Sequence, residues 1–220
     1  MKNAHRYLVG SVLLLCMVSL RAADHADSPG NVADPAADLT DVFAWTTPNA
    51  TQVNLIIGVP AAQFSNAVQY VINVESSSAY GRTGTKVQII CQFAVNQSVE
   101  CWVGGFDYLQ GTASATTGLR SVTGRMLAFV GRRNDPFFIN GPGLRRTLDI
   151  VAAAAPGLTF DTAGCPILDA GTSNALITEL QTGGDSFALG SPSFLVLQVD
   201  KSLIAPGGNI LAVDASTHRS

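Results

Sequence analysis

The sequence has few positive charges and few histidines, and these shortages exclude several classes of function. It contains 13 Lys and Arg residues against 16 Asp and Glu residues, with three histidines in all. Nucleic acids and anionic membrane surfaces are bound by clustered cations, whereas the closest clusters here are pairs of arginines. We therefore expect no nucleic-acid partner, and so few histidines also exclude a His-rich catalytic metal site.

Several motifs of known chemistry are also missing. The chain has no Gly-x-Ser-x-Gly nucleophile elbow, no phosphate-binding glycine loop and no dinucleotide-binding fingerprint. It also lacks the H-E-x-x-H zinc motif and the spacing of an EF-hand calcium loop. The sequence therefore identifies no reaction. Whether the protein is an enzyme stays open, with a non-catalytic role favoured.

No apolar run is long enough to span a membrane, but a shorter run stands near the N-terminus. Residues 8–20 are a thirteen-residue apolar stretch that follows two basic residues and precedes Ala22 and Ala23. A spanning helix needs about 20 apolar residues, so this pattern is typical of a cleavable export signal. We expect residues 1–22 to be a signal peptide cut near Ala22 or Ala23. The mature protein would be periplasmic or secreted, without a stable membrane anchor after cleavage.

Cleavage would leave an acidic chain of single-domain size. It removes Lys2, Arg6 and Arg21 but no acidic residue, so the formal net charge falls from −3 to −6. Residues 23–220 suit the length of one β domain, and no linker divides them. We therefore predict a single domain over 23–220.

Short segments rich in β-branched and aromatic residues recur along this chain, bounded by Gly, Pro, Asn or Ser. Helical patterns are confined to 144–155 and to 174–180, where Ser173 is the expected N-cap. Residues 194–199 are apolar almost throughout, which predicts a central strand covered on both faces. We expect 206–209 to turn the last two strands into a hairpin. The fold class predicted is all-β, an antiparallel β-sandwich with one or two short helices. The predicted strands are 40–45, 52–59, 68–75, 86–95, 99–104, 125–131, 193–200 and 209–216.

Two of the three cysteines of the mature chain are placed to form a disulfide. Alternation puts Cys91 and Cys101 on one face of neighbouring strands, and a loop over 95–97 would set them opposite each other. Opposed Cα atoms lie about 4.5–5.5 Å apart, within disulfide range, and an exported protein meets an oxidising compartment. The alternative is two reduced core cysteines. Cys165 is left over, and we expect a small buried residue there rather than a nucleophile.

The segment 23–45 holds five of the acidic residues together with a histidine. An Asp-Pro pair at 34–35 predicts a turn or one helical turn, in which three aspartates would converge. Carboxylates so close together are costly unless cations offset their repulsion. Calcium suits carboxylate ligands, and a histidine among them would favour a transition metal. The candidate metal ligands are His25, Asp27, Asp34, Asp38 and Asp41.

A structural role for the same aspartates is the alternative. Aspartate is common in turns because its side chain accepts hydrogen bonds from nearby backbone N–H groups. Ion pairs with Arg125, Arg132 or Arg133 would also neutralise the carboxylates without a metal. Two functions follow. The favoured one is a non-catalytic binding or structural module whose partner is an envelope protein, a glycan or a cation. The other is a metal-assisted hydrolase in which the acidic cluster holds the metal.

Three blocks of the sequence resemble the bacterial DUF4331 family. They are H-A-D-S-P…D-P-A-A-D-L-T-D-V-F-A-W at 25–45, V-G-R-R-N-D-P-F-F at 130–138, and F-L-V-L-Q-V-D…I-L-A-V-D-A-S-T at 194–217. The blocks come in the family's order and together span nearly all of the mature chain. The resemblance implies an exported protein with one domain. The family has no established activity, so the resemblance implies no reaction.

Overall fold

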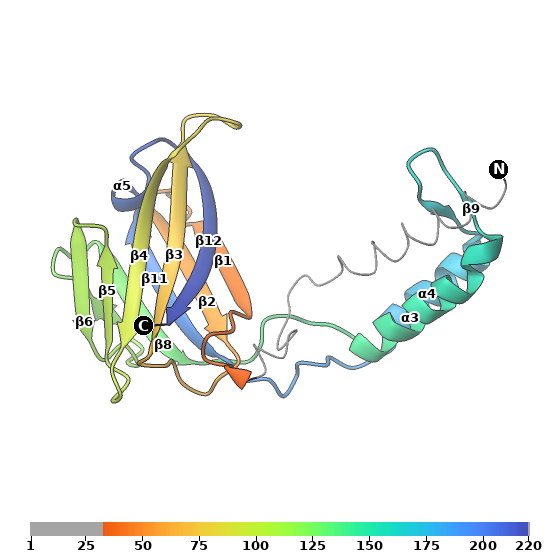
Figure 1. Cartoon of the computed structure of the whole chain (residues 1–220), viewed down its shortest axis with the longest axis horizontal. Helices are drawn as coiled ribbons and strands as arrows, with labels where there is room; N and C mark the ends of the chain where they lie inside the picture. The colour runs from red at the N-terminus through yellow and green to blue at the C-terminus, as the bar shows by residue number, and fades with distance from the viewer. Residues whose placement is uncertain (1–32, 220) are drawn as a thin grey trace. The chain divides into compact units, whose positions relative to one another are not determined.

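Two antiparallel five-stranded sheets pack together in the structure, a computed structural model that describes residues 33–219 (Figure 1). The predicted β-sandwich is confirmed. The first sheet has the order β1-β2-β11-β8-β7 and the second has the order β12-β3-β4-β5-β6. The strands of the first sheet are β1 (Asp41–Thr46), β2 (Gln52–Val59), β7 (Leu119–Arg120), β8 (Met126–Arg132) and β11 (Ser193–Asp200). Those of the second are β3 (Val68–Ser77), β4 (Thr85–Phe93), β5 (Val99–Val103), β6 (Asp107–Gly111) and β12 (Ile210–Arg219).

Alternation of side chains explains how these strands make a core. Successive residues of a strand point to opposite faces of its sheet, so every second residue of β2 points inward. Val53, Leu55, Ile57 and Val59 are each at most 2% exposed. They belong to one apolar cluster with the inward residues of the second sheet. Burying a side chain of this size stabilises the fold by about 1.5–3 kcal/mol, so the common core holds the two sheets together.

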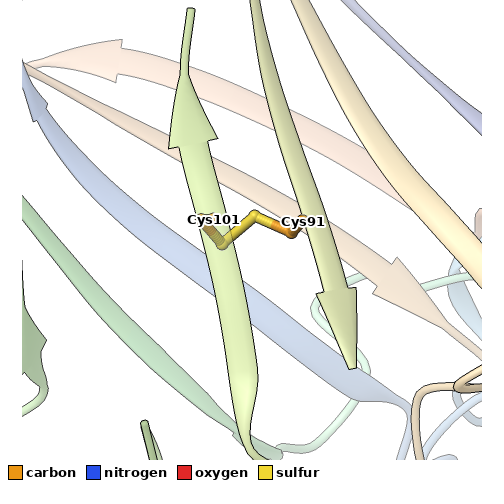
Figure 2. The surroundings of a disulfide bond; sticks show 2 residues. All are labelled: Cys91 and Cys101. Atoms are coloured by element: carbon orange, nitrogen blue, oxygen red, sulfur yellow. A yellow bond between two sulfur atoms is a disulfide. The ribbon is translucent and has the colours of Figure 1, made fainter. Parts of the chain in front are cut away.

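The predicted disulfide is present inside this core. Cys91 on β4 pairs directly with Cys101 on β5 in the strand register, with 4.2 Å between their Cα atoms. Figure 2 shows the bond joining these adjacent strands. The loop between them is the expected one: Ala94 N–H donates to Ser98 O, and Gln97 takes the left-handed conformation with φ of 63°. The bond therefore cross-links two neighbouring strands of the second sheet.

One predicted connection is wrong. The strand β11 lies at the centre of the first sheet, as expected, although Val196 and Gln198 on its outer face are only half-buried. However, β11 and β12 do not form a hairpin, because β12 pairs with β3 in the second sheet. The chain crosses between the sheets through α5 (Lys201–Ile204) and the turn that follows it.

Burial of α5 explains this crossing. Leu203 and Ile204 lie in the core at 3% and 0% exposure, so α5 closes one end of the sandwich. Gly207 then donates its N–H to Ser76 Oγ at 2.8 Å. A Cβ on Gly207 would lie 2.2 Å from the carbonyl oxygen of Ser76, so only glycine allows this approach. The Pro-Gly-Gly-Asn motif predicted a reversal of the chain correctly, but it does not say which sheet the chain enters.

Residues 134–191 form a second compact unit, whose ends connect to β8 and β11. It consists of α3 (Gly141–Ala154), η1 (Ala155–Gly157), the short strands β9 (Thr159–Phe160) and β10 (Pro166–Ile167), and α4 (Ala170–Gln181). No helix within residues 33–219 is long and apolar enough to cross a membrane. The single domain predicted over 23–220 stays a prediction, and its described part comprises two compact units.

Two expectations for this second unit are corrected. The N-cap of α4 is Asp169, which accepts a hydrogen bond from Thr172 N–H at 2.8 Å, so the helix begins before the predicted cap Ser173. Cys165 is exposed, not buried, because it lies in the loop between β9 and β10. Asn140 joins the two helices: it caps α3 through Gly143 N–H and donates to Glu179 O at 2.9 Å.

Asp107, at the start of β6, fastens one edge of the sandwich. Its carboxylate accepts hydrogen bonds from Ser121 Oγ at 2.6 Å and Thr123 Oγ1 at 2.8 Å, both in the turn between β7 and β8 of the other sheet. Burial alone would raise the pKa of this carboxyl, but the hydrogen bonds from Ser121, Thr123 and Tyr108 N–H outweigh it and hold the pKa below its usual range. The charged form of Asp107 therefore links the two sheets.

This link predicts a pH-dependent loss of stability. The Asp107→Asn variant is expected to lose about 1–3 kcal/mol of unfolding free energy at neutral pH, because two hydroxyl donors lose a charged acceptor. The folded-state pKa lies below the unfolded value of about 3.9, so the stabilisation is present above about pH 4. It is lost as the pH falls through the folded pKa.

Urea unfolding at a series of pH values, followed by circular dichroism, measures this effect. The difference between wild type and Asp107→Asn should be largest at neutral pH and should shrink below about pH 4. Asp149→Asn, an exposed position on α3, is the matched control and should follow the wild-type curve. A difference that stayed constant down to about pH 2 would contradict the role of the Asp107 charge.

Candidate functional site

The structure places three of the five candidate metal ligands, and it does not bring them together. His25 and Asp27 lie outside the described residues. Asp34 accepts a hydrogen bond from Arg219 Nε at 2.5 Å and forms an ion pair with it, while Asp38 and Asp41 are buried at 4% and 9% exposure. Within residues 33–219, no three His, Cys, Asp or Glu side chains form a metal-binding group. A metal site therefore stays a prediction, and for Asp34 the ion-pair alternative holds, with an arginine that the sequence did not indicate.

Residues 34–40, here called the strap, are hydrogen-bonded to both sheets. Asp34 begins a turn closed by the hydrogen bond from Ala37 N–H to its carbonyl oxygen. On the second sheet, the hydroxyls of Tyr70 and Thr217 donate to the carbonyl oxygens of Ala36 and Ala37, each at 2.7 Å. On the first sheet, Thr40 N–H donates to Gly58 O at 2.9 Å. The chain then continues directly into β1, so the strap fastens the edge opposite Asp107.

Tyr70 is the anchor of the strap. Its ring is fully buried between Phe64 and Phe93, with ring centroids 4.9 Å and 5.6 Å away in edge-to-face geometry. Its hydroxyl accepts from Ser65 N–H at 2.9 Å while it donates to Ala36 O. Burial raises the pKa of Tyr70 above its ordinary value, so the hydroxyl keeps the proton that it donates.

The outer face of the second sheet carries a hollow of about 700 Å³, which is the candidate binding site. It was not predicted from the sequence. Ligand pockets of proteins commonly enclose about 300–1,000 Å³, so its size suits a small molecule or a segment of a polymer. Residues from four neighbouring strands and from the β5–β6 loop line it. The lining includes Asn73, Gln88, Asp214, Trp102, Phe106 and Lys86.

One side of the hollow is a ladder of polar side chains across three strands. Asp214, Asn73 and Gln88 stand opposite one another on β12, β3 and β4. Gln88 Nε2 donates to Asn73 Oδ1 at 2.9 Å, and Asn73 Nδ2 donates to Asp214 Oδ1 at 2.7 Å. Each amide orients the next one, so the side chains of this polar ladder are held in position for a ligand.

The other side of the hollow is aromatic. Trp102 on β5 lies beside Tyr108 on β6, with ring centroids 5.6 Å apart and the rings tilted by 37°. Phe106, in the loop between these strands, is 62% exposed. Gly104 follows β5 with φ of 51°, and a Cβ there would lie 3.3 Å from the Phe106 ring, so glycine keeps this corner open. Partial burial and the Glu100 carboxylate raise the pKa of Tyr108 above its ordinary value.

Charges at the rim are few and mixed. Lys86 Nζ lies 3.6 Å from Glu75 Oε2, and Glu75 also accepts a hydrogen bond from Gly84 N–H in the β3–β4 turn. Asp214 adds a second carboxylate. Amide, carboxylate and aromatic groups on one sheet face suit non-covalent binding of a ligand with polar edges and flat apolar surfaces.

Comparisons with protein-family models, with curated proteins and with solved structures found no match to this chain. The resemblance to DUF4331 therefore stays a prediction.

Two substitutions measure separately how much the Tyr70 hydroxyl and the ion pair between Arg219 and Asp34 stabilise the fold. Tyr70→Phe removes one hydroxyl and leaves Ala36 O and Ser65 N–H without their partner, so we expect a loss of about 1–3 kcal/mol of unfolding free energy. Arg219→Gln removes an ion pair whose two side chains are partly exposed, and we expect a loss below about 1 kcal/mol. Urea unfolding of both variants measures these two losses, and the loss in Tyr70→Phe should be the larger one. If Tyr70→Phe left the free energy of unfolding unchanged, the buried hydroxyl would not anchor the strap.

Proposed function

We propose that the protein is an exported, non-catalytic β-sandwich module that binds its ligand in the hollow on the outer face of the second sheet. The observation that carries this proposal is the pairing of the oriented Asp214–Asn73–Gln88 ladder with the aromatic surface of Trp102 and Phe106 in one hollow. Polar groups that fix orientation beside an apolar contact surface are the usual composition of a ligand site.

The disulfide and the signal-like N-terminus support the exported part of the proposal. Disulfides persist in oxidising compartments, and the Cys91–Cys101 bond lies in the sheet that bears the hollow. Residues 1–22 have the charge and apolar pattern of a cleavable signal. A periplasmic or secreted location accordingly belongs to the proposal.

The side chains of the hollow favour binding over catalysis. Their hydrogen bonds run from amide to amide to carboxylate, and these three side chains include no hydroxyl or thiol that could act as a nucleophile. The hydrolase hypothesis needs the acidic residues of 25–41 to bind a metal instead. One of them, Asp34, forms an ion pair with Arg219. We therefore place the function at the hollow, and an envelope component is its expected partner.

Calorimetric titration of the mature protein with five chemically distinct probes tests the proposal. The probes are cellohexaose, chitohexaose, hexagalacturonate, a proline-rich peptide and an oligolysine. At least one should bind, and Trp102→Ala should weaken it by about tenfold or more, because the main aromatic contact is lost. The matched control is Trp45→Ala, which removes a half-exposed tryptophan from β1 of the other sheet and should leave binding unchanged.

Fluorescence gives a second readout for the same probes. The sequence contains two tryptophans, so Trp45→Phe leaves Trp102 as the sole reporter. A bound ligand should change its emission. Binding of none of the five probes, or binding that is equally strong in the Trp102→Ala variant, would overturn the proposed function.

A further inference from the structure

The hydrogen-bonding groups left over at the hollow point to a definite class of ligand. We infer that the hollow binds a neutral glycan chain, with a sugar ring on Trp102 and sugar hydroxyls on the polar ladder. This inference rests on the proposed function and specifies its ligand. Three features carry it: the unused hydrogen-bonding capacity of the ladder, the balance of charge at the rim, and the aromatic surface beside both.

The first feature is the mixture of donors and acceptors that the ladder leaves for a ligand. A glutamine side chain has two donor hydrogens and an acceptor oxygen, and Gln88 uses only one donor, toward Asn73. Asp214 Oδ2 and Gln88 Oε1 have no hydrogen bond to any residue of the part of the chain that the structure describes. The ladder therefore offers free acceptors and a free donor side by side. Sugar hydroxyls both donate and accept, so adjacent hydroxyls of one ring satisfy both kinds of group.

The second feature is charge. Asp214 and Glu75 are acceptor-only groups when ionised, and Lys86 compensates one of them at 3.6 Å. An anionic ligand would meet the carboxylate of Asp214, which forms no ion pair within residues 33–219, and close like charges are unfavourable. A proline-rich peptide has few N–H groups, so it would leave this carboxylate without donors. Neutral hydroxyl groups supply the donors without the repulsion.

The third feature is the aromatic surface. Trp102 is half-buried and Phe106 is exposed, so both rings present apolar area at the hollow. A pyranose ring has hydroxyls around its edge and C–H groups on its faces. It can therefore lie against an aromatic ring while its edge reaches hydrogen-bonding groups, as here across β3, β4 and β5. The hollow extends over four neighbouring strands and encloses about 700 Å³, so a chain of sugars rather than a single ring fits it.

Matched neutral and anionic oligosaccharides test the inference with the mature protein. Cellohexaose and chitohexaose are the neutral probes and hexagalacturonate is the anionic one, each titrated by calorimetry. At least one neutral probe should bind, and at least tenfold more tightly than hexagalacturonate. Its affinity should stay within about twofold between about 50 and 500 mM NaCl, because screening by salt acts on charged ligands.

Substitutions in the ladder locate the binding. Gln88→Ala should weaken the neutral probe about three- to tenfold, the cost of one or two hydrogen bonds. Gln198→Ala is the matched control, because this glutamine forms a similar amide pair with Asn54 on the first sheet, at 3.0 Å. It should leave the affinity unchanged. Melting temperatures of all variants identify any variant that fails to fold. If Gln88→Ala fails to fold, Gln88→Glu replaces it, because this substitution keeps the shape of the side chain and adds a charge. The expected weakening of binding is the same.

The outcomes separate this inference from the proposed function. In one outcome, the anionic sugar, the proline-rich peptide or the oligolysine binds in place of the neutral sugars, and Trp102→Ala weakens that binding. This result would contradict the inference of a neutral glycan ligand but would support the proposed binding module. Neutral sugar binding that Gln88→Ala does not weaken would overturn the role of the ladder. Binding of no probe would overturn both.

Discussion

One inward-facing row of side chains across the second sheet makes the contacts on which the rest of the structure depends. In register across β12, β3, β4, β5 and β6, the row consists of Thr217, Tyr70, Cys91, Cys101 and Leu109. Thr217 and Tyr70 hold the strap by their hydroxyls, and the next two residues form the disulfide. A single line of contacts therefore joins the beginning of the described chain, its last strand and the middle of the second sheet.

This row also supports the candidate site. The residues next to it in sequence point outward, because side chains alternate along a strand. Trp102 follows Cys101, and Tyr108 precedes Leu109. The aromatic side of the hollow therefore stands on the same strands, one residue away from the disulfide and the buried apolar side chain. A site on hydrogen-bonded strands, two of which the disulfide joins, loses little freedom when it binds, which favours affinity.

Local sequence patterns predicted most of the strands and the disulfide, but they did not predict the contacts between distant segments. The bounds of β2 and β11 match the prediction, because both are apolar, β-branched and bounded by clear turns. The cysteine pair followed from alternation and one short loop. By contrast, β6 and β7 are short and contain Asp, Gly and Arg, so neither shows a strand pattern. The polar ladder needs the register of three strands at once: Asn73 and Asp214 are 141 residues apart, and nothing in one segment indicates the other. Arg219 was missed as the partner of Asp34 for the same reason.

The central claim is that the strap is part of the folded sandwich, and amide hydrogen exchange tests it most directly. The N–H of Thr40 donates to Gly58 O on β2 and has no other role in a helix or strand ladder. If the strap is fastened as described, this proton should exchange as slowly as the amides of β2 and β3, by opening of the whole sandwich. Exchange of Thr40 at the rate of an unprotected peptide, with β2 and β3 still protected, would contradict the account.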